Sequence, residues 1–176
     1  MTPTIKPLFS AGVIRTRIGE LGAKIQSDLR REDPLVVSIL GGSVIFLADL
    51  IRVLTDPLRF EFVQVDYSAR GDGQVLEIQY PIPIDVEGQS LLVLKDVVAS
   101  GVTETYLASQ FRERGASAVR FAALIDLPGE RKLEFKVDYP LFPVDRRGTF
   151  VGYGLKRDGR YGSLPYIALV EAEATA

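Results

Sequence analysis

The thirteen residues Leu91–Thr103 constrain the fold of this chain more than any other stretch. They begin with four apolar residues suited to a buried strand, and Asp96 lies near the carboxyl end of that strand. A turn of small residues follows, and then an amphipathic helix begins. Backbone N–H groups at a helix N-terminus favour an anion, so this segment predicts a phosphate-binding turn that contains no general base of its own. The predicted phosphate-binding residues are Ala99, Ser100, Gly101, Val102 and Thr103.

Strand and helix patterns alternate along the rest of the chain. Apolar residues at three- and four-residue spacing, such as Ile14, Ile18 and Leu21, indicate helices, and short apolar runs indicate strands. The expected helices are residues 11–31, 44–54 and 103–114. The expected strands are residues 35–40, 59–65, 74–80, 91–98 and 119–125, with short ones near 150–151 and 166–170. This alternation predicts an α/β domain with a mostly parallel sheet flanked by helices.

The connections between these elements add local detail. Ser43 can cap the helix that follows Gly41-Gly42, and Gly115 can end the helix over 103–114. Residues 68–73 are expected to form a mobile loop. Without an internal repeat or low-complexity linker, residues 1–176 are expected to form one domain. Ligands of parallel sheets bind beyond the carboxyl ends of the strands, where Gly41-Gly42 and the predicted phosphate turn both fall.

Composition excludes several kinds of chemistry. The 176 residues include no cysteine and no histidine, which removes disulfides, thiolate ligands and the usual general base. A net charge of −2 argues against a nucleic-acid partner, and the basic residues of the tail are interpreted as a solvated face. The sequence shows no signal pattern and no apolar run of membrane-spanning length, so we expect a cytoplasmic protein without membrane contact.

An ordered series of short motifs covers nearly the whole chain. The first are Ile39-Leu40-Gly41-Gly42, Phe46-Leu47-Ala48-Asp49-Leu50, Val86-Glu87-Gly88 and the 91–103 block. The later ones are Leu124-Ile125-Asp126, Pro128, Val137-Asp138-Tyr139, Val151-Gly152-Tyr153-Gly154-Leu155, Arg160-Tyr161 and Leu164-Pro165-Tyr166-Ile167. Each motif is weak alone. In this order, the chain resembles the bacterial hypoxanthine-guanine phosphoribosyltransferases.

The resemblance implies a fold and an activity. The fold is the type I phosphoribosyltransferase fold, a mostly parallel twisted sheet flanked by helices, with a small hood formed by the terminal segments. The activity joins a purine base to phosphoribosyl pyrophosphate and releases pyrophosphate. A homodimer or homotetramer is expected. Mg²⁺ is expected only if the protein is active, because in this family the substrate and an acidic pair supply most of the magnesium site.

The resemblance also implies roles for individual positions. The 5′-phosphate falls on the 99–103 turn, and the ribose falls on Lys95 and Asp96. The residues at the pyrophosphate loop are Leu40, Gly41 and Gly42. The residues at the base are Leu127, Phe150, Val151 and Lys156, and no residue is assigned as a metal ligand.

Several side chains depart from the family pattern. Ala99 stands where a carboxylate exchanges a proton with the purine, and Lys95 replaces the first member of the acidic pair. The family's lysines are missing at Gly41 and Leu127, and its base-stacking aromatic ring is missing at Thr149, where Phe150 could replace it after a slip of one residue. The family's late aspartate and arginine are replaced by Lys156 and Gly162. Because losing one general acid or base costs roughly 10²–10⁴-fold, these departures together predict little turnover and no confident catalytic residue.

Three functional hypotheses follow. The main expectation is a catalytically impaired or inactive protein that keeps a phosphate- or nucleotide-binding turn for a regulatory or binding role. One alternative is an active phosphoribosyltransferase with altered substrate or chemistry, and the other is a structural partner subunit of an active homologue. The first two predict a phosphorylated small molecule as the ligand, either a nucleotide or phosphoribosyl pyrophosphate.

Overall fold

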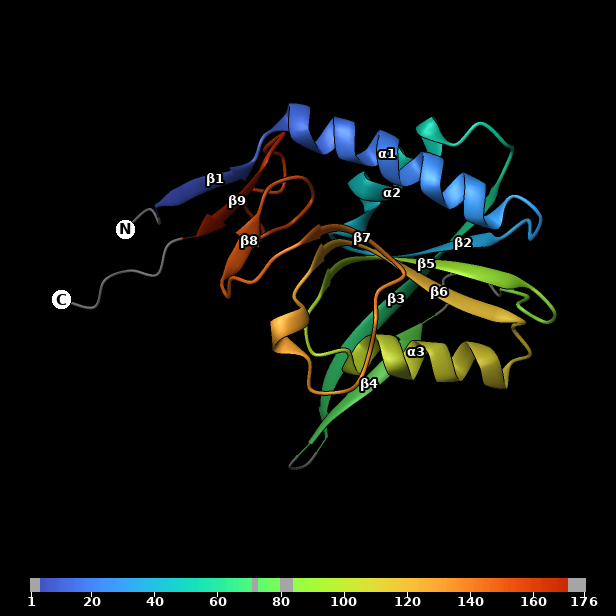
Figure 1. The fold of residues 1–176 in the computed structure, drawn as a ribbon. Helices are drawn as coiled ribbons and strands as arrows, with labels where there is room; N and C mark the ends of the chain where they lie inside the picture. Colours follow the sequence, from blue (N-terminus) through green and yellow to red (C-terminus); the bar gives the residue numbers. More distant parts are fainter. Residues whose placement is uncertain (1–3, 71–72, 80–83, 171–176) are drawn as a thin grey trace.

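A computed structural model describes residues 4–70, 73–79 and 84–170, and these residues form two β-sheets with flanking helices (Figure 1). The helices are α1 (Ala11–Leu29), α2 (Ser43–Val53), α3 (Val102–Glu113) and the short 3-10 helix η1 (Pro128–Glu130). The strands are β1 (Ile5–Phe9), β2 (Leu35–Ile39), β3 (Arg59–Arg70), β4 (Gly73–Gln79), β5 (Ser90–Val98), β6 (Ala118–Asp126), β7 (Tyr139–Pro143), β8 (Thr149–Val151) and β9 (Ile167–Val170). The expected α/β alternation is confirmed.

The main sheet has the strand order β4-β3-β2-β5-β6-β7. Every neighbouring pair from β3 to β7 is parallel, and only β4 runs antiparallel, as the hairpin partner of β3. Leu35 of β2 pairs with Leu91 of β5, which in turn pairs with Val119 of β6. The carboxyl ends of these central strands therefore lie at one edge of the sheet, as the sequence predicts.

Two apolar layers cover opposite faces of this sheet. On one face α1 and α2 pack on β5 through Ile14, Ile18, Phe46, Leu50, Leu92 and Leu94. On the other face α3 packs on β5 and β6 through Leu91, Val93, Leu107, Phe111 and Phe121. Figure 1 shows α1 and α2 above the sheet and α3 below it. Alternate residues of β5 thus face different helices, and each fully buried large side chain contributes about 1.5–3 kcal/mol.

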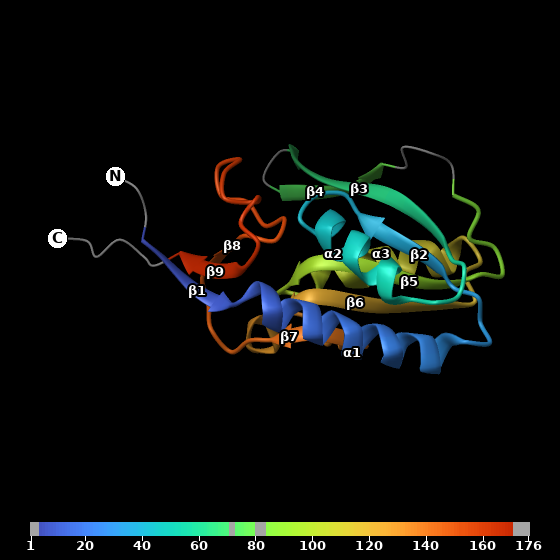
Figure 2. The same cartoon turned by 90° about the horizontal axis from the view of Figure 1, so that it is seen from above.

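A second sheet of three antiparallel strands, in the order β1-β9-β8, forms the hood. Ile5 of β1 pairs with Val170 of β9, so segments from the two ends of the sequence lie side by side. Figures 1 and 2 show the hood standing beyond one end of the main sheet, where β5 leads into α3. The predicted hood of terminal segments is confirmed.

Two local expectations differ from the structure, and two strands were not expected. Ser43 is the first residue of α2 and not its cap, because its Oγ shares a hydrogen bond with Ser38 Oγ at 2.9 Å and donates to the Ile39 carbonyl oxygen. The expected loop over 68–73 is largely strand, since the β3–β4 hairpin continues to the pair of Arg70 and Gly73. Residues 71–72, and Tyr80 of the expected fourth strand, lie outside the described residues. Neither β1 nor β7 was expected.

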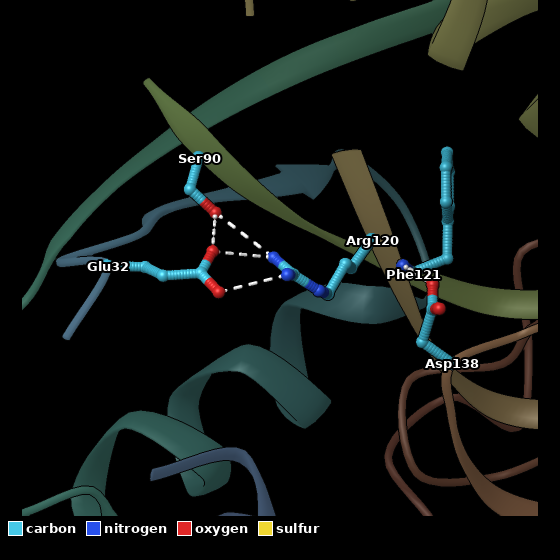
Figure 3. A network of polar contacts seen from close by, with 5 residues as sticks. All are labelled: Glu32, Ser90, Arg120, Phe121 and Asp138. Atoms are coloured by element: carbon cyan, nitrogen blue, oxygen red, sulfur yellow. Dashed lines mark hydrogen bonds and ion pairs between the residues drawn. The ribbon is translucent and has the colours of Figure 1, made fainter. Parts of the chain in front are cut away.

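At the amino ends of β5 and β6, a charged network ties the sheet to the loop after α1 (Figure 3). The Arg120 guanidinium donates to both carboxylate oxygens of Glu32, at 2.7 and 2.9 Å, and Ser90 Oγ donates to the same carboxylate at 2.7 Å. Next to it, the Asp138 carboxylate accepts the backbone N–H of Phe121 at 2.8 Å. These contacts stabilise the edge of the sheet that lies opposite the predicted phosphate turn.

Candidate functional site

The turn between β5 and α3 has the geometry of an anion-binding turn. Gly101 precedes α3 with a φ of 78°, a left-handed conformation that favours glycine. A side chain there would also collide, since an added Cβ would lie 2.8 Å from Cβ of Phe135. The first helical hydrogen bond runs from Thr105 N to the Gly101 carbonyl oxygen at 3.0 Å. The positive end of the α3 dipole therefore lies at the carboxyl edge of the sheet.

Arg131 holds the carbonyl groups along one side of this turn. Its Nη1 donates to the carbonyl oxygens of Val98 (3.0 Å), Ala99 (2.6 Å) and Leu127 (3.2 Å), and its Nε donates to that of Phe135 (3.0 Å). Its Nη2 forms an ion pair with Asp126, and both side chains are largely buried. One guanidinium thus joins the predicted phosphate turn to the loop that carries the predicted base residue Leu127.

The Ser100 carbonyl is held on the same side. It accepts the N–H groups of Lys132 at 2.9 Å and Leu133 at 3.2 Å. In a trans peptide unit the C=O and the following N–H point in opposite directions, so the N–H groups of Ser100 and Gly101 point away from the 131–133 segment. Two backbone donors turned to one side beside a helix N-terminus can receive a phosphate. The geometry favours phosphate binding at the predicted turn.

The loop over residues 40–42, where pyrophosphate is predicted to bind, contacts the end of β5 at Gly42. A Cβ added to Gly42 would lie 2.6 Å from Oδ2 of Asp96 and 3.0 Å from the side chain of Leu155. From the hood side, a Cβ added to Gly154 would lie 2.6 Å from the Gly42 carbonyl oxygen. The 40–42 loop, the end of β5 and the turn after β8 therefore touch one another. Gly41 has a φ of 136°, so the loop takes this path through a conformation that favours glycine.

Lys95 and Asp96 form an ion pair within this region. Lys95 Nζ lies 3.1 Å from Asp96 Oδ1, and the two side chains are 18% and 27% exposed. Oδ1 also accepts the backbone N–H of Val97 at 2.8 Å. Oδ1 is therefore engaged twice, while Oδ2 faces the 40–42 loop. Lys95 stands where the family pattern has an acid, so a cation is paired with Asp96, the acid that is retained.

The residues predicted to contact the base fall into two groups. Leu127, Phe150 and Val151 are buried, the first two in the apolar layer that also contains α1 and α2. Lys156 is exposed, and its stem passes so close to Gly162 that a Cβ on Gly162 would lie 2.9 Å from Lys156 Cγ. The structure does not bring an aromatic ring of this group to an open surface, so their contact with a base stays a prediction.

Glu104 is a functional candidate that we did not single out from the sequence. It lies on the buried face of α3, three and seven residues before Leu107 and Phe111. A carboxyl group on the apolar stripe of an amphipathic helix is the sequence signal that could have identified it. Burial raises the pKa of Glu104, and the charges of Lys95 and Arg131 act in the opposite direction. A titratable group therefore lies in the first turn of α3, directly after the predicted phosphate turn.

The side chains of this region do not form a magnesium site. No group of three or more acidic residues with metal-binding geometry occurs among residues 4–70, 73–79 and 84–170. Asp96, the retained acid, is already paired with Lys95. A divalent cation needs several oxygen ligands, whereas Asp96 and Asp126 are each already paired with a cation and Glu104 is buried.

None of the helices in the described ranges combines the length and apolar character needed to cross a bilayer.

The chain is similar to known proteins along nearly its whole length. Residues 9–157 match the family described as the phosphoribosyl transferase domain. The hypoxanthine-guanine phosphoribosyltransferase of Bacillus subtilis (strain 168) is 35% identical over 170 residues, which cover 94% of this chain and 93% of that protein. The enzyme of the same name from Streptococcus thermophilus (strain CNRZ 1066) is 33% identical over 172 residues, covering 96% and 94%.

Solved structures have the same architecture. A crystal structure of a hypoxanthine-guanine phosphoribosyltransferase from Bacillus anthracis superimposes with a TM-score of 0.86 at 28% identity, covering 97% of this chain and 100% of that one. A variant of the Trypanosoma cruzi hypoxanthine phosphoribosyltransferase, solved as a ternary substrates complex, has a TM-score of 0.87 at 31% identity and covers 97% of each chain. The same variant has been solved with the product IMP.

Proposed function

We propose a function from one established premise: this chain belongs to the phosphoribosyltransferase family, within the hypoxanthine-guanine phosphoribosyltransferases. The proposal is that it is an active phosphoribosyltransferase with altered substrate or chemistry. It would transfer the phosphoribosyl group of phosphoribosyl pyrophosphate to a ring nitrogen of a heterocyclic base and release pyrophosphate. Purines are the first class of acceptor to consider, because the relatives are named for hypoxanthine and guanine.

The main expectation from the sequence, a catalytically impaired binding protein, is wrong by these comparisons. Relatives matched over more than nine-tenths of both lengths carry the name of an active transferase. The structures that superimpose on the chain include one in a complex with substrates. The description of the site as degenerate has no support beyond the side-chain departures from the family pattern, and the enzymatic alternative fits the relatives better.

The observation that carries the proposal is the meeting at Gly42. The contacts of Gly42 with Asp96 and with Gly154 bring the predicted pyrophosphate loop, the predicted ribose-binding residue and the turn after β8 close together. The predicted phosphate turn begins at Ala99, three residues after Asp96 and directly after the end of β5. A substrate with a phosphate at one end, a ribose in the middle and pyrophosphate at the other end needs these features in this order.

The proposed chemistry assigns a task to each feature. The new bond joins a base nitrogen to C1′ of the ribose, and the C1′–O bond to pyrophosphate breaks with its electron pair leaving on pyrophosphate. The N–H groups of Ser100 and Gly101 would hold the 5′-phosphate, and Oδ2 of Asp96 would accept a ribose hydroxyl. The carboxylate of Asp96 would also stabilise positive charge that develops on the ribose. The backbone of Gly41 and Gly42 would receive the pyrophosphate.

Because of Ala99, the altered step is the removal of a proton from the acceptor base. It has no group that could take a proton from the acceptor, and histidine is absent from the whole sequence. An acceptor that has already lost its proton reacts without a general base. We therefore expect the rate of turnover to rise with pH as the acceptor base ionises. Acceptors with acidic ring N–H groups should react faster than those with weakly acidic ones.

The test is formation of nucleotide and pyrophosphate by the purified protein. Phosphoribosyl pyrophosphate would be supplied with hypoxanthine, guanine, xanthine, adenine and a pyrimidine base in turn, over a range of pH. We expect turnover with at least one base and a rate that increases with pH. Absence of turnover with every base, whether or not calorimetry shows binding of phosphoribosyl pyrophosphate, would overturn the proposal.

Three further expectations remain part of the proposal. The chain is expected to unfold as one domain, to assemble as a homodimer or homotetramer, and to act in the cytoplasm. A single cooperative unfolding transition and the mass in solution by light scattering would test the first two, and fractionation of cells would test the third.

A further inference from the structure

The turn after β8 holds three consecutive residues in the left-handed backbone region. The φ angles are 90° at Gly152, 51° at Tyr153 and 94° at Gly154. Glycine adopts this conformation freely, whereas a tyrosine keeps it only where its surroundings hold it there. The N–H of Tyr153 donates to the Leu164 carbonyl oxygen at 2.8 Å, and the N–H of Gly154 donates to the Gly162 carbonyl oxygen at 2.9 Å. One side of the turn is therefore fixed to the segment that leads to β9.

The side chain of Tyr153 fixes the other side of this turn to α2. The residue is 7% exposed, and its ring packs in the apolar layer that contains α1 and α2. Its hydroxyl donates to Oδ2 of Asp49 at 2.6 Å, across 104 positions of the sequence. Oδ1 of the same carboxylate lies 3.4 Å from the exposed side chain of Arg52. Burial, and then the hydrogen bond to Asp49, raise the pKa of Tyr153, so the hydroxyl keeps its proton and remains a donor.

The turn contacts α2 along a face that begins at the 40–42 loop. A Cβ added to Gly154 would lie 2.6 Å from the Gly42 carbonyl oxygen and 3.3 Å from Ile45 Cγ1. Asp49 follows Ile45 by four residues, so the two lie one helical turn apart on the same face of α2. The turn therefore touches the backbone at the start of α2 and is hydrogen-bonded to the helix further along.

The path of the 40–42 loop depends on these contacts. At its start, the N–H of Leu40 donates to the Val63 carbonyl oxygen at 2.7 Å. At its end, Gly42 lies between Asp96 and Gly154. Between them, a Cβ added to Gly41 would meet nothing within 4 Å. The backbone at Gly41 is therefore positioned by its two ends, and a shift of the turn on α2 would move the end at Gly42.

We propose that Tyr153 is a positioning residue, whose hydrogen bond to Asp49 holds the turn after β8 against Gly42 and so fixes the 40–42 loop in the conformation that receives pyrophosphate. This inference rests on the proposed function for its ligand. The predicted phosphate turn belongs to another connection, between β5 and α3. The effect of Tyr153 is therefore expected at the pyrophosphate end of the substrate.

The test compares the calorimetric binding of two fragments of the substrate. Inorganic pyrophosphate, in buffer with Mg²⁺, probes the 40–42 loop, and ribose 5-phosphate probes the predicted phosphate turn. Tyr153→Phe keeps the ring and removes the hydroxyl, so the loop spends less time in its binding conformation. We expect the Kd for pyrophosphate to rise about tenfold and the Kd for ribose 5-phosphate to change by less than about twofold. An unchanged Kd for pyrophosphate, or an equal rise for both fragments, would overturn the proposal.

A double-mutant cycle identifies Asp49 as the partner. Asp49→Ala should reproduce the rise in the Kd for pyrophosphate, and adding Tyr153→Phe to it should change that Kd by less than about twofold. Asp49→Asn keeps an oxygen that accepts from the tyrosine hydroxyl and should retain most of the wild-type affinity. Tyr106→Phe, at a tyrosine of α3 that is 39% exposed, is the matched control and should leave both Kd values unchanged. Equal effects of Tyr153→Phe in both backgrounds would contradict the pairing.

Failure of the proposed function would be visible separately, because binding of pyrophosphate needs no turnover. If the wild-type protein binds pyrophosphate in a manner that depends on Tyr153 but forms no nucleotide with any base, the proposed function fails and the role of Tyr153 stands. If the protein forms nucleotide and Tyr153→Phe leaves the Kd for pyrophosphate unchanged, the role of Tyr153 fails and the proposed function stands. A wild-type protein that binds no pyrophosphate would also overturn the role of Tyr153.

Discussion

The α-carbon of Gly42 lies against the carboxylate of Asp96, so that a methyl group on Gly42 would come within 2.6 Å of Asp96 Oδ2. The backbone φ of Gly42 is −69°, which any residue adopts, so glycine is required here for space and not for conformation. The loop after β2 and the end of β5 can approach this closely only without a side chain. This contact places the predicted pyrophosphate loop beside the predicted ribose acceptor.

Gly42→Ala should weaken use of phosphoribosyl pyrophosphate. The new methyl group must push the 40–42 loop away from Asp96 or displace the carboxylate. A shift of about 1 Å in a bound substrate can cost about 100-fold, and we expect kcat/KM to fall by between about 10- and 100-fold. Gly129→Ala in η1 is the control, since a Cβ there meets nothing within 4 Å. Equal kcat/KM for Gly42→Ala and wild type would contradict the close contact.

Arg131→Met should both unfold the protein more easily and reduce activity. It removes the donors to the Ala99 and Leu127 carbonyl oxygens and leaves the buried Asp126 carboxylate without its cation. Breaking a buried ion pair from one side costs about 3–5 kcal/mol, which urea denaturation would measure. Arg147→Met, at a side chain that is 83% exposed, should change stability by less than about 0.5 kcal/mol. A loss no larger than that of this control would refute the role of Arg131.

Ala99→Asp should increase turnover of purines with weakly acidic N–H groups. The substitution adds a carboxylate to the phosphate turn, at the position where the family resemblance implies proton exchange. General-base catalysis contributes roughly 10²–10⁴-fold, so we expect kcat to rise by about 100-fold and its increase with pH to flatten. Steady-state kinetics of both proteins across pH provide the comparison. A variant that loses activity while it still binds phosphoribosyl pyrophosphate would show that the acceptor binds elsewhere.

The Glu32–Arg120 network predicts how stability depends on pH. The hydrogen bond from Arg120, and then that from Ser90, lower the pKa of Glu32 below its ordinary 4.5. The unfolded chain then binds more protons than the folded one between these two pKa values. The network therefore stabilises the protein above about pH 4.5, and this contribution is lost as the pH falls through the lowered pKa. Denaturation of wild type and Glu32→Gln between pH 3 and pH 7 would measure it.

The difference in the free energy of unfolding between wild type and Glu32→Gln should shrink as the pH falls. Glu20→Gln, at an exposed pair with Arg17 on α1, is the matched control and should show little difference at any pH. A constant gap between Glu32→Gln and wild type over the whole range would contradict the assignment.

Two glycines of α1 predict opposite effects of the same substitution. A Cβ on Gly19 meets nothing within 4 Å, so Gly19→Ala should stabilise the protein by about 0.5–1 kcal/mol. A Cβ on Gly22 would lie 2.6 Å from Cγ2 of Val53, and valine is stiff at χ1. Gly22→Ala should therefore cost about 1–3 kcal/mol, because α1 and α2 must move apart. Thermal unfolding of both variants would show whether the helices approach as closely as described.

Local patterns in the sequence predicted most of the main sheet and its helices. The three helices lie within two residues of their expected bounds, and the strand over 35–39 is buried on both faces as expected. These features depend on neighbouring residues, whose spacing is visible in the chain itself. The strand β1 was missed because it is short and pairs with a segment near the other end of the chain, as Ile5 does with Val170. The strand β7 was missed because two of its five residues, Pro140 and Pro143, are prolines, which disfavour a strand pattern.

The sequence by itself determined the α/β alternation, the glycine turns at the carboxyl ends of two strands and the absence of histidine and cysteine. Only the tertiary structure decided which groups meet there: Gly42 lies against Asp96, and Arg131 joins two loops. Secondary structure follows from the spacing of apolar residues within a few turns or one strand. Contacts between segments dozens of residues apart depend on how whole layers pack, and no local pattern encodes that packing.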